Sequence, residues 1–242
     1  MIQLINFSKV YGSKKAVDEI NLKAEKGCIT GLLGLNGAGK TTIIKAVTGI
    51  HLATAGKVLV SDENGTFFNA EENLAKIKEN TGYLPETLSF PENLTVMEFL
   101  SLLCLQSESS KSQLDKICSD CSLSDVFTNK IKTLSKGYRQ RLAFAQALIH
   151  SPENIILDEP VNGLDPAQII KMRELIKAAS RTKTVLLSTH LMQEAEALCD
   201  KIYILHKGKI AAEGTETEIK QMTACKTLEE AFLKITGESE ND

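Results

Sequence analysis

Long uninterrupted runs of apolar residues are absent from this sequence. A membrane-spanning helix needs about 18 or more consecutive apolar residues, and no stretch of the 242-residue chain approaches that length. The opening residues, MIQLINFSK, also lack the charged leader and apolar run of a secretory signal. We therefore expect a cytosolic chain that reaches a membrane only through a partner.

A strong net charge and a metal-type cysteine pattern are also missing. The 28 basic and 31 acidic residues are interspersed and give a formal charge of -3, which argues against a nucleic-acid partner held by overall charge. Of six cysteines, only Cys118 and Cys121 have CxxC spacing, and no second pair or nearby histidine completes a zinc site. We expect two reduced thiols one helical turn apart. His51, His150 and His206 match no motif, so we expect surface or packing roles for them.

Apolar periodicity divides the chain into a strand-and-helix pattern with one helical insertion. The hydrophobic content of 43% suffices for a buried core in one sizeable α/β domain or two small ones. Spacings of three and four between about 94 and 150 predict helices, and a polar segment fills 61–80. Strands are predicted at 2–7, 20–24, 28–33, 81–84, 155–157, 184–188 and 201–205, a hairpin turn at 207–208, and helices at 41–47, 166–179, 192–198 and from 216.

A glycine-rich loop lies between the third predicted strand and the first predicted helix. It fits the phosphate-binding pattern GxxxxGK[ST], also called Walker A. Glycines let successive backbone N–H groups converge on an anion at a helix N-terminus. Lys40 would contact the β- and γ-phosphates, Thr41 would bind Mg²⁺, and Thr42 would reach the α-phosphate. The loop consists of Gly34, Leu35, Asn36, Gly37, Ala38, Gly39, Lys40 and Thr41, followed by Thr42.

Two carboxylates follow the apolar strand at 155–157, in the pattern called Walker B. Beside a phosphate loop, Asp158 would hold the Mg²⁺ shell and Glu159 would polarise the attacking water. These two motifs suit many enzymes that bind nucleoside triphosphates, including small-molecule kinases and GTPases.

The sequence LSKGYRQ at 134–140 narrows the choice among these enzyme classes. Ser135 can cap a helix there, and the Gly137 backbone can approach an anion. One nucleotide cannot readily use two such helix starts of one small domain, so a second protomer would present its Ser135 turn.

This combination of motifs resembles the ATP-binding cassette (ABC) family, whose signature usually reads LSGGQ at this place. The resemblance spans nearly the whole chain. It implies that Tyr11 stacks on adenine, that Asp165 in the sequence Gly-Leu-Asp belongs to the D-loop, and that His190 is the switch histidine that contacts the γ-phosphate.

Two positions depart from the family pattern. Lys136 stands where the signature usually has glycine, and its ammonium would either approach the partner's γ-phosphate or point to solvent. Glu86 stands where the Q-loop usually has glutamine, and it would still accept from a metal-bound water while adding negative charge near Mg²⁺. Both departures resemble the ABC-2 branch, which serves bacterial multidrug, sodium and gliding-type exporters.

The resemblance implies an α/β P-loop NTPase of RecA-like type, with core segments 1–85 and 151–215, a helical subdomain at 86–150 and a helical tail at 216–242. It implies ATP and Mg²⁺ as cofactors, a second ATP-binding subunit that contributes Ser135, Lys136 and Gly137 in trans, and integral-membrane permease subunits.

Two alternatives to a transport function remain at this point. One is a soluble ABC ATPase of DNA repair or translation, although the sequence has neither a long coiled-coil insertion nor a second cassette. The other is a regulatory cassette with little turnover.

Overall fold

Buried apolar strands form the central sheet of the computed structural model, which describes residues 1–107 and 109–237. The sheet has the strand order β10-β9-β3-β8-β7-β6. Three of its strands are buried along their whole length: β3 (Ile29–Leu33), β7 (Asn154–Asp158) and β8 (Thr184–Thr189). Parallel strands with both faces covered read as nearly continuous apolar runs, which is why the sequence revealed them.

The parallel direction of these strands places the connections that follow them at one edge of the sheet. Strands β6 (Thr81–Leu84), β7, β8, β3 and β9 (Lys201–His206) are parallel, and β10 (Lys209–Gly214) returns antiparallel to β9. Because β8 pairs with both β3 and β7, the loop after β8 emerges between the loops after those two strands. Ligands bind at this carboxyl edge in open parallel sheets.

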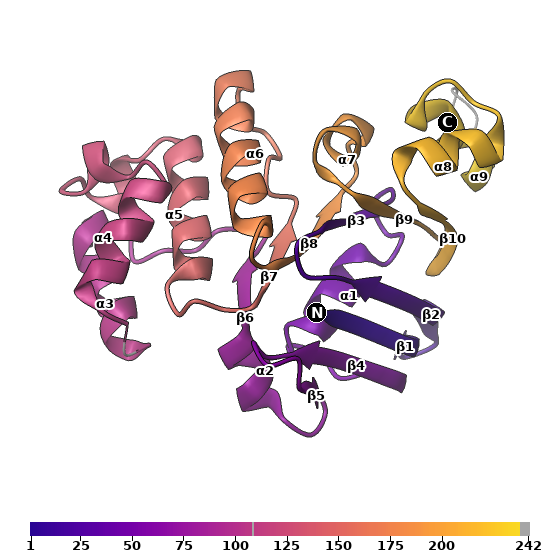
Figure 1. Ribbon diagram of the computed structural model, residues 1–242, viewed down its shortest axis with the longest axis horizontal. Coiled ribbons are helices and arrows are strands. Elements are labelled where there is room, and N and C mark those ends of the chain that lie inside the picture. The colour runs from indigo at the N-terminus through magenta and orange to yellow at the C-terminus, as the bar shows by residue number, and fades with distance from the viewer. Residues whose placement is uncertain (108, 238–242) are drawn as a thin grey trace.

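A second, antiparallel sheet encloses the first helix. Its order is β2 (Lys14–Ala24), β1 (Ile2–Tyr11), β4 (Ala55–Ser61) and β5 (Phe67–Asn69). Helix α1 (Lys40–Val47) lies between the two sheets in Figure 1, and its apolar residues share one buried cluster with side chains from both. The start of α1 is therefore held from two sides.

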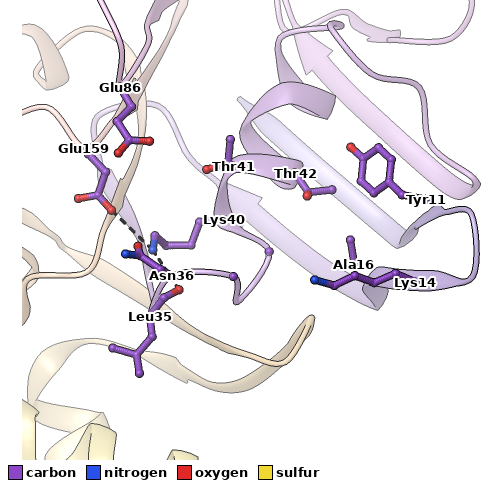
Figure 2. Close-up of a pocket in the computed structure, with 12 residues that line it drawn as sticks. Tyr11, Lys14, Ala16, Leu35, Asn36, Lys40, Thr41, Thr42, Glu86 and Glu159 are labelled. Carbon is purple, nitrogen blue, oxygen red and sulfur yellow. Dashed lines mark hydrogen bonds and ion pairs between the residues drawn. The ribbon is translucent and has the colours of Figure 1, made fainter.

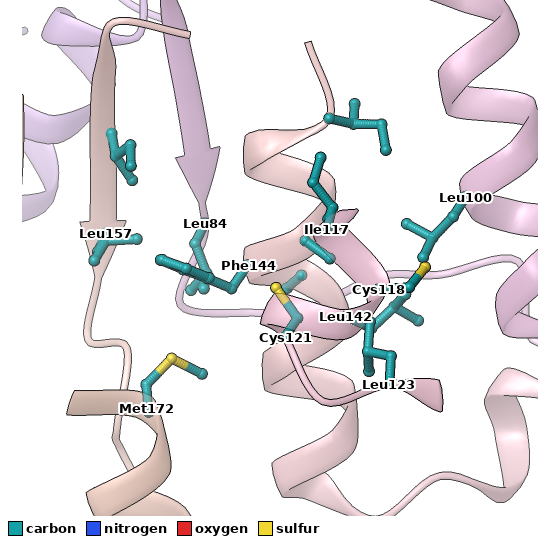
Figure 3. Packing of buried hydrophobic residues seen from close by; sticks show 14 of the residues in the cluster. Leu84, Leu100, Ile117, Cys118, Cys121, Leu123, Leu142, Phe144, Leu157 and Met172 are labelled. Carbon is teal, nitrogen blue, oxygen red and sulfur yellow. The ribbon is translucent and has the colours of Figure 1, made fainter. Parts of the chain in front are cut away.

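A group of helices covers the β6 side of the central sheet (Figure 1). The elements of this region are α3 (Val96–Gln106), α4 (Lys111–Asp120), the short helices η1 (Ser124–Val126) and η2 (Ile131–Thr133), α5 (Lys136–Leu148) and α6 (Pro166–Ser180). Figure 3 shows Phe144 of α5 beside Leu84 of β6 in one apolar core. Cys118 and Cys121 are free thiols in this core, and burial raises their pKa to about 11 and about 12. They therefore act as small apolar packing groups at neutral pH.

Three helices lie at the β9 and β10 side of the central sheet (Figure 1). They are α7 (Met192–Leu198), α8 (Glu216–Thr223) and α9 (Leu228–Thr236). Both α8 and α9 begin with a capping box, in which a threonine and the glutamate three residues later satisfy each other's backbone N–H groups. Apolar residues of α9 pack on β9. The last part of the helical tail proposed from sequence, residues 238–242, lies outside the described residues.

The predicted strands and helices are confirmed at each of their sites, and the main omission falls around the polar segment 61–80. That region contains β5 and α2 (Leu74–Asn80), and β4 precedes it. β5 is only three residues long, and Ile77 is the buried residue of α2. Elements this short leave no detectable periodicity. β1 and β2 are also longer than predicted, because their ends carry polar side chains on exposed faces.

Asn154 joins the two sheets and α2 through a fully buried side-chain amide. Its Nδ2 donates to the carbonyls of Ser61 at 2.8 Å and Asn80 at 3.0 Å. We expect Asn154→Ala to lower the free energy of unfolding by about 2–4 kcal/mol, because one buried and one partly buried carbonyl lose their donor. Urea denaturation measures this change. Asn64→Ala, in an exposed turn, is the control and should stay within about 0.5 kcal/mol of the unaltered chain. Equal stabilities for the two variants would show that the Asn154 hydrogen bonds do not stabilise the fold.

Candidate functional site

The phosphate loop connects the end of β3 to the start of α1 and is packed against other backbone segments. Gly37 and Gly39 have φ of 82° and 114°, which favour glycine. A Cβ on Gly39 would lie 2.9 Å from the carbonyl oxygen of Ala16, and a Cβ on Gly34 would lie 2.5 Å from that of Leu205. Conformation therefore requires glycine at position 37, close approach requires it at position 34, and both require Gly39. The loop therefore presents its N–H groups in a fixed arrangement at the N-terminus of α1, a setting that favours an anion.

An open cleft of about 340 Å³ lies over this loop (Figure 2). Ten of the sequence-predicted residues line it. Lys14 and Ala16 line it as well and were not predicted, because they belong to no motif and come from β2. Gly34 and Ala38 complete the loop without lining the cleft: the Gly34 N–H donates to Thr189 and the Ala38 N–H to Leu35. The predicted lining residues are Tyr11, Leu35, Asn36, Gly37, Gly39, Lys40, Thr41, Thr42, Glu86 and Glu159.

Lys40 is the buried cation of the cleft. Its side chain is 6% exposed, and its ammonium donates to the carbonyl of Gly34 at 2.6 Å and of Leu35 at 3.3 Å. It also lies 3.6 Å from a carboxylate oxygen of Glu159, whose side chain is 7% exposed. Figure 2 shows this ammonium between the loop and the carboxylate. Lys40 thus neutralises Glu159 when no phosphate is bound.

Glu159 also contacts His190. The Nδ1 of His190 lies 2.9 Å from the second carboxylate oxygen of Glu159. Because a carboxylate only accepts, Nδ1 carries the hydrogen in this contact. The Glu159 backbone has φ of 51°, a rare conformation for a residue with a side chain, and its N–H donates to the Ser188 carbonyl. This turn aims the carboxylate at the histidine of the adjacent strand.

Asp158 is the last residue of β7 and is buried. The hydroxyl of Ser188 on β8 donates to its carboxylate. Burial raises the pKa of Asp158 above its ordinary value, and the nearby carboxylates of Glu86 and Glu159 raise it further. The site therefore holds more negative charge than Lys40 alone offsets, which suits an added cation. Within the described residues, no group of three or more His, Cys, Asp or Glu side chains could hold a metal by itself.

Tyr11 is at the far end of the same cleft. The residue is 42% exposed, and its ring makes an edge-to-face contact with His51, with ring centroids 5.8 Å apart. The ammonium of Lys9 lies 5.2 Å from the Tyr11 centroid. His51, for which sequence reasoning found no motif, therefore supports an aromatic face at the mouth of the cleft.

The signature turn and the D-loop contact each other away from the phosphate loop. Ser135 caps α5 by accepting from the Tyr138 N–H, as its sequence position predicted. A Cβ on Gly137 would lie 2.5 Å from Oε1 of Gln168 on α6. The Lys136 ammonium lies against Gly163, where an added Cβ would be 2.3 Å away. Lys136 therefore lies over the D-loop of its own chain, an arrangement that neither sequence-based alternative included.

The N-terminus of α6 and the first turn of α5 are fixed by polar side chains. Asp165 caps α6 by accepting from the Gln168 N–H at 3.0 Å. Arg139 makes two hydrogen bonds to the carboxylate of Glu92, at 2.5 Å and 3.1 Å. Sequence reasoning missed this pair, because the two residues are 47 positions apart.

The comparisons with known proteins agree with this arrangement of motifs. Residues 17–162 match the family model described as ABC transporter. The chain belongs to the ABC transporter family. Two curated relatives of this ABC subunit are bacterial. The ABC transporter ATP-binding protein YdbJ of Bacillus subtilis (strain 168) is 36% identical over 98% of this chain and 78% of the relative. The bacitracin transport ATP-binding protein BcrA of Bacillus licheniformis is 38% identical over 88% of this chain and 69% of the relative.

Solved structures confirm the α/β P-loop fold of the ABC subunit. An ATP-binding subunit of an ABC transporter superposes with a TM-score of 0.87 at 27% identity, covering 98% of this chain and 99% of that one. A dimeric ATP-binding cassette in a post-hydrolysis state, bound to ADP and Pi, superposes with a TM-score of 0.77 at 25% identity, covering 89% and 98%. The chain is an ATP-binding subunit of an ABC transporter. In its described part no helix is long and apolar enough to cross a bilayer.

The buried charge of Asp158 costs stability in the nucleotide-free chain. Asp158→Asn removes the charge and retains an acceptor for Ser188, so we expect the melting temperature at neutral pH to rise by about 2–4 °C, corresponding to about 1 kcal/mol. Because folding raises the pKa of Asp158, the unaltered aspartate gains stability as it becomes protonated in acid, and the difference should shrink there.

Differential scanning calorimetry at neutral and acidic pH measures both effects. Asp125→Asn, at an exposed position, is the matched control and should change stability by less than about 0.5 kcal/mol. A neutral-pH melting temperature of Asp158→Asn below that of the unaltered chain would show that the Asp158 charge is stabilising.

Proposed function

We propose that this subunit binds ATP with Mg²⁺ between two cassettes and hydrolyses it, and that the cycle powers export through separate membrane permease subunits. The observation that carries the proposal is the buried contact set of Lys40, Glu159 and His190 beside the phosphate loop. It joins a phosphate-binding cation, a base and a histidine at the carboxyl edge of one parallel sheet.

The loop and α1 supply the binding of the triphosphate. Backbone N–H groups at the start of α1 would bind phosphate oxygens, and Lys40 would contact the β- and γ-phosphates. Thr42 would reach the α-phosphate, and Tyr11 would stack on the adenine at the open end of the cleft. The cleft is lined by both Tyr11, at the end of β1, and Glu159, just after β7, which supports a bound molecule with a base at one end and phosphates at the other.

Three oxygen-bearing side chains suit Mg²⁺ at the loop. Thr41 and Asp158 would hold the ion directly, and Glu86 would accept hydrogen bonds from its water shell. The excess carboxylate charge around Asp158 supports this fit. When bound, Mg²⁺ would supply positive charge that offsets the charge of the phosphates during transfer.

Glu159 is the base in this proposal. Phosphate oxygens would compete with Glu159 for Lys40, and the carboxylate released from that ion pair could then accept a proton from the attacking water. His190 would keep the carboxylate oriented through Nδ1 and present the other edge of its ring toward the γ-phosphate. The same contacts therefore restrain Glu159 before nucleotide binds and aim it afterwards.

A second ATP-binding subunit would complete each site. The cleft over the phosphate loop lacks Ser135 and Gly137 of its own chain, which supports their use in trans on the partner's nucleotide. Lys136 would move from Gly163 toward that nucleotide, and Asp165 would couple the two sites. The dimeric cassette among the structural relatives supports this pairing.

The names of the relatives support a transport role. BcrA is named for bacitracin transport, and we infer an exporter whose membrane partner determines the substrate. The subunit would then work in the cytoplasm, at the inner face of the cell membrane, bound to its permease.

Glu159→Gln tests the hydrolysis step. The amide cannot act as a base, so we expect single-turnover hydrolysis to fall by about 100- to 10,000-fold while ATP still binds. Lys40→Ala is the contrasting variant and should lose ATP affinity as well. Radiolabelled ATP binding and phosphate release measure the two properties separately. Turnover in Glu159→Gln equal to that of the unaltered chain would remove Glu159 from the proposed mechanism.

Recovery of the subunit from its native membrane in mild detergent tests the transport assignment. We expect an integral-membrane protein to co-purify and to raise the steady-state ATPase rate of the reconstituted complex over that of the isolated chain. Glu159→Gln should co-purify with the same protein but show no stimulated hydrolysis. An active ATPase that brings down no membrane protein would favour a soluble ABC ATPase, and a complex without ATPase activity would favour a regulatory cassette.

A further inference from the structure

A partly buried ion pair joins α6 to α7 outside the catalytic contacts described above. Nη2 of Arg173 donates to Oε1 of Glu194 at 2.5 Å, and Nε donates to Oε2 at 3.2 Å. The Glu194 side chain is 5% exposed and that of Arg173 is 30% exposed. Two parallel hydrogen bonds from a planar guanidinium fix orientation as well as distance. The pair therefore holds one helix at a defined angle to the other.

The helix on the receiving side, α7, depends on such an anchor. It has only seven residues, and its N-cap, Leu191, offers no side-chain cap. So short a helix has little stability of its own. Glu194 is in its first turn, where its N–H donates to the Leu191 carbonyl at 3.1 Å. His190 immediately precedes this cap, so the backbone that carries the imidazole continues directly into the helix that Arg173 holds.

The donating helix, α6, also contacts the D-loop and the signature turn, the two other segments that would move in the proposed cycle. Its N-cap is Asp165 of the D-loop. One turn later, the amide of Gln168 packs against Gly137 of the signature turn, and its Oε1 is buried without a hydrogen-bond partner among the described residues. Arg173 follows on the same helix. A continuous helix of 15 residues thus contacts the signature turn, the D-loop and, through Glu194, the switch histidine.

We propose that Arg173 is a positioning residue for His190, and that α6 acts as a rigid connection between the signature turn and the switch histidine of the same chain. The role of His190 in hydrolysis rests on the function proposed above, whereas the structural link does not. A partner's nucleotide that displaced the signature turn would press on Gln168. The displacement would then reach His190 through Arg173 and Glu194.

The structural part is tested in the nucleotide-free chain by NMR. The four histidines give a small set of imidazole resonances, which can be assigned by substitution. We expect Arg173→Gln to shift the His190 resonances while leaving those of His51 unchanged, because His51 contacts Tyr11 at the other end of the cleft. Glu194→Gln should produce a similar shift. Asn154→Ala controls for destabilisation without breaking the ion pair and should leave the His190 resonances in place.

The functional part is tested by ATP binding and hydrolysis. Arg173→Gln should lower kcat by about tenfold, as expected when a catalytic group is slightly misplaced. KM should change less than twofold, because neither Arg173 nor Glu194 lines the cleft over the phosphate loop. Arg173→Lys retains the charge and one hydrogen bond, so it should recover part of kcat. Its His190 resonances should fall between those of the unaltered chain and Arg173→Gln.

Failure of the positioning role and failure of the proposed function give different results. Unshifted His190 resonances in folded Arg173→Gln and Glu194→Gln would overturn the positioning role, whatever the ATPase rate. An equal loss of kcat in Asn154→Ala would overturn it as well, because general destabilisation would then account for the effect. Absence of ATPase activity in the unaltered chain would instead count against the proposed function and leave the resonance test intact.

Discussion

The ion pair between Lys40 and Glu159 is the interaction on which the rest of the site depends. Both side chains are almost fully buried, and each would be costly to leave alone in that environment. Lys40 is at the first position of α1, and Glu159 follows the end of β7, so the pair joins elements that are far apart in sequence. In the proposed function, a triphosphate would offer Lys40 a stronger partner than Glu159. Charge balance would then link nucleotide binding to the release of the Glu159 carboxylate.

The strand order makes this balance possible. β8 lies between the strand that carries the phosphate loop and the strand that carries Asp158. It supplies Ser188 to Asp158 and, one step beyond its end, His190 to Glu159. A different order would place the histidine outside hydrogen-bonding reach of the carboxylate. The geometry of the site therefore depends on the order of the strands at this edge of the sheet. Helices α6 and α7, which follow β7 and β8, adjust it further.

The sequence was informative where structure is local and limited where it depends on distant partners. The phosphate loop and the carboxylates after β7 were predictable because short motifs adjoin apolar strands that are buried on both faces. Strand β4 was missed because its apolar residues form a run of three, and helix α2 because Ile77 is its buried residue. Lys14, Ser188 and the Arg173–Glu194 pair belong to no motif. Lys136 shows the same limit: its type was noticed, but its contact with Gly163 depends on how α5 meets the D-loop.

The left-handed backbone of Glu159 has a consequence for sequence drift in this lineage. Asparagine and aspartate tolerate that conformation better than most residues, whereas β-branched side chains do not. Replacement of Glu159 by asparagine or aspartate would therefore preserve the turn but shorten the side chain that contacts His190.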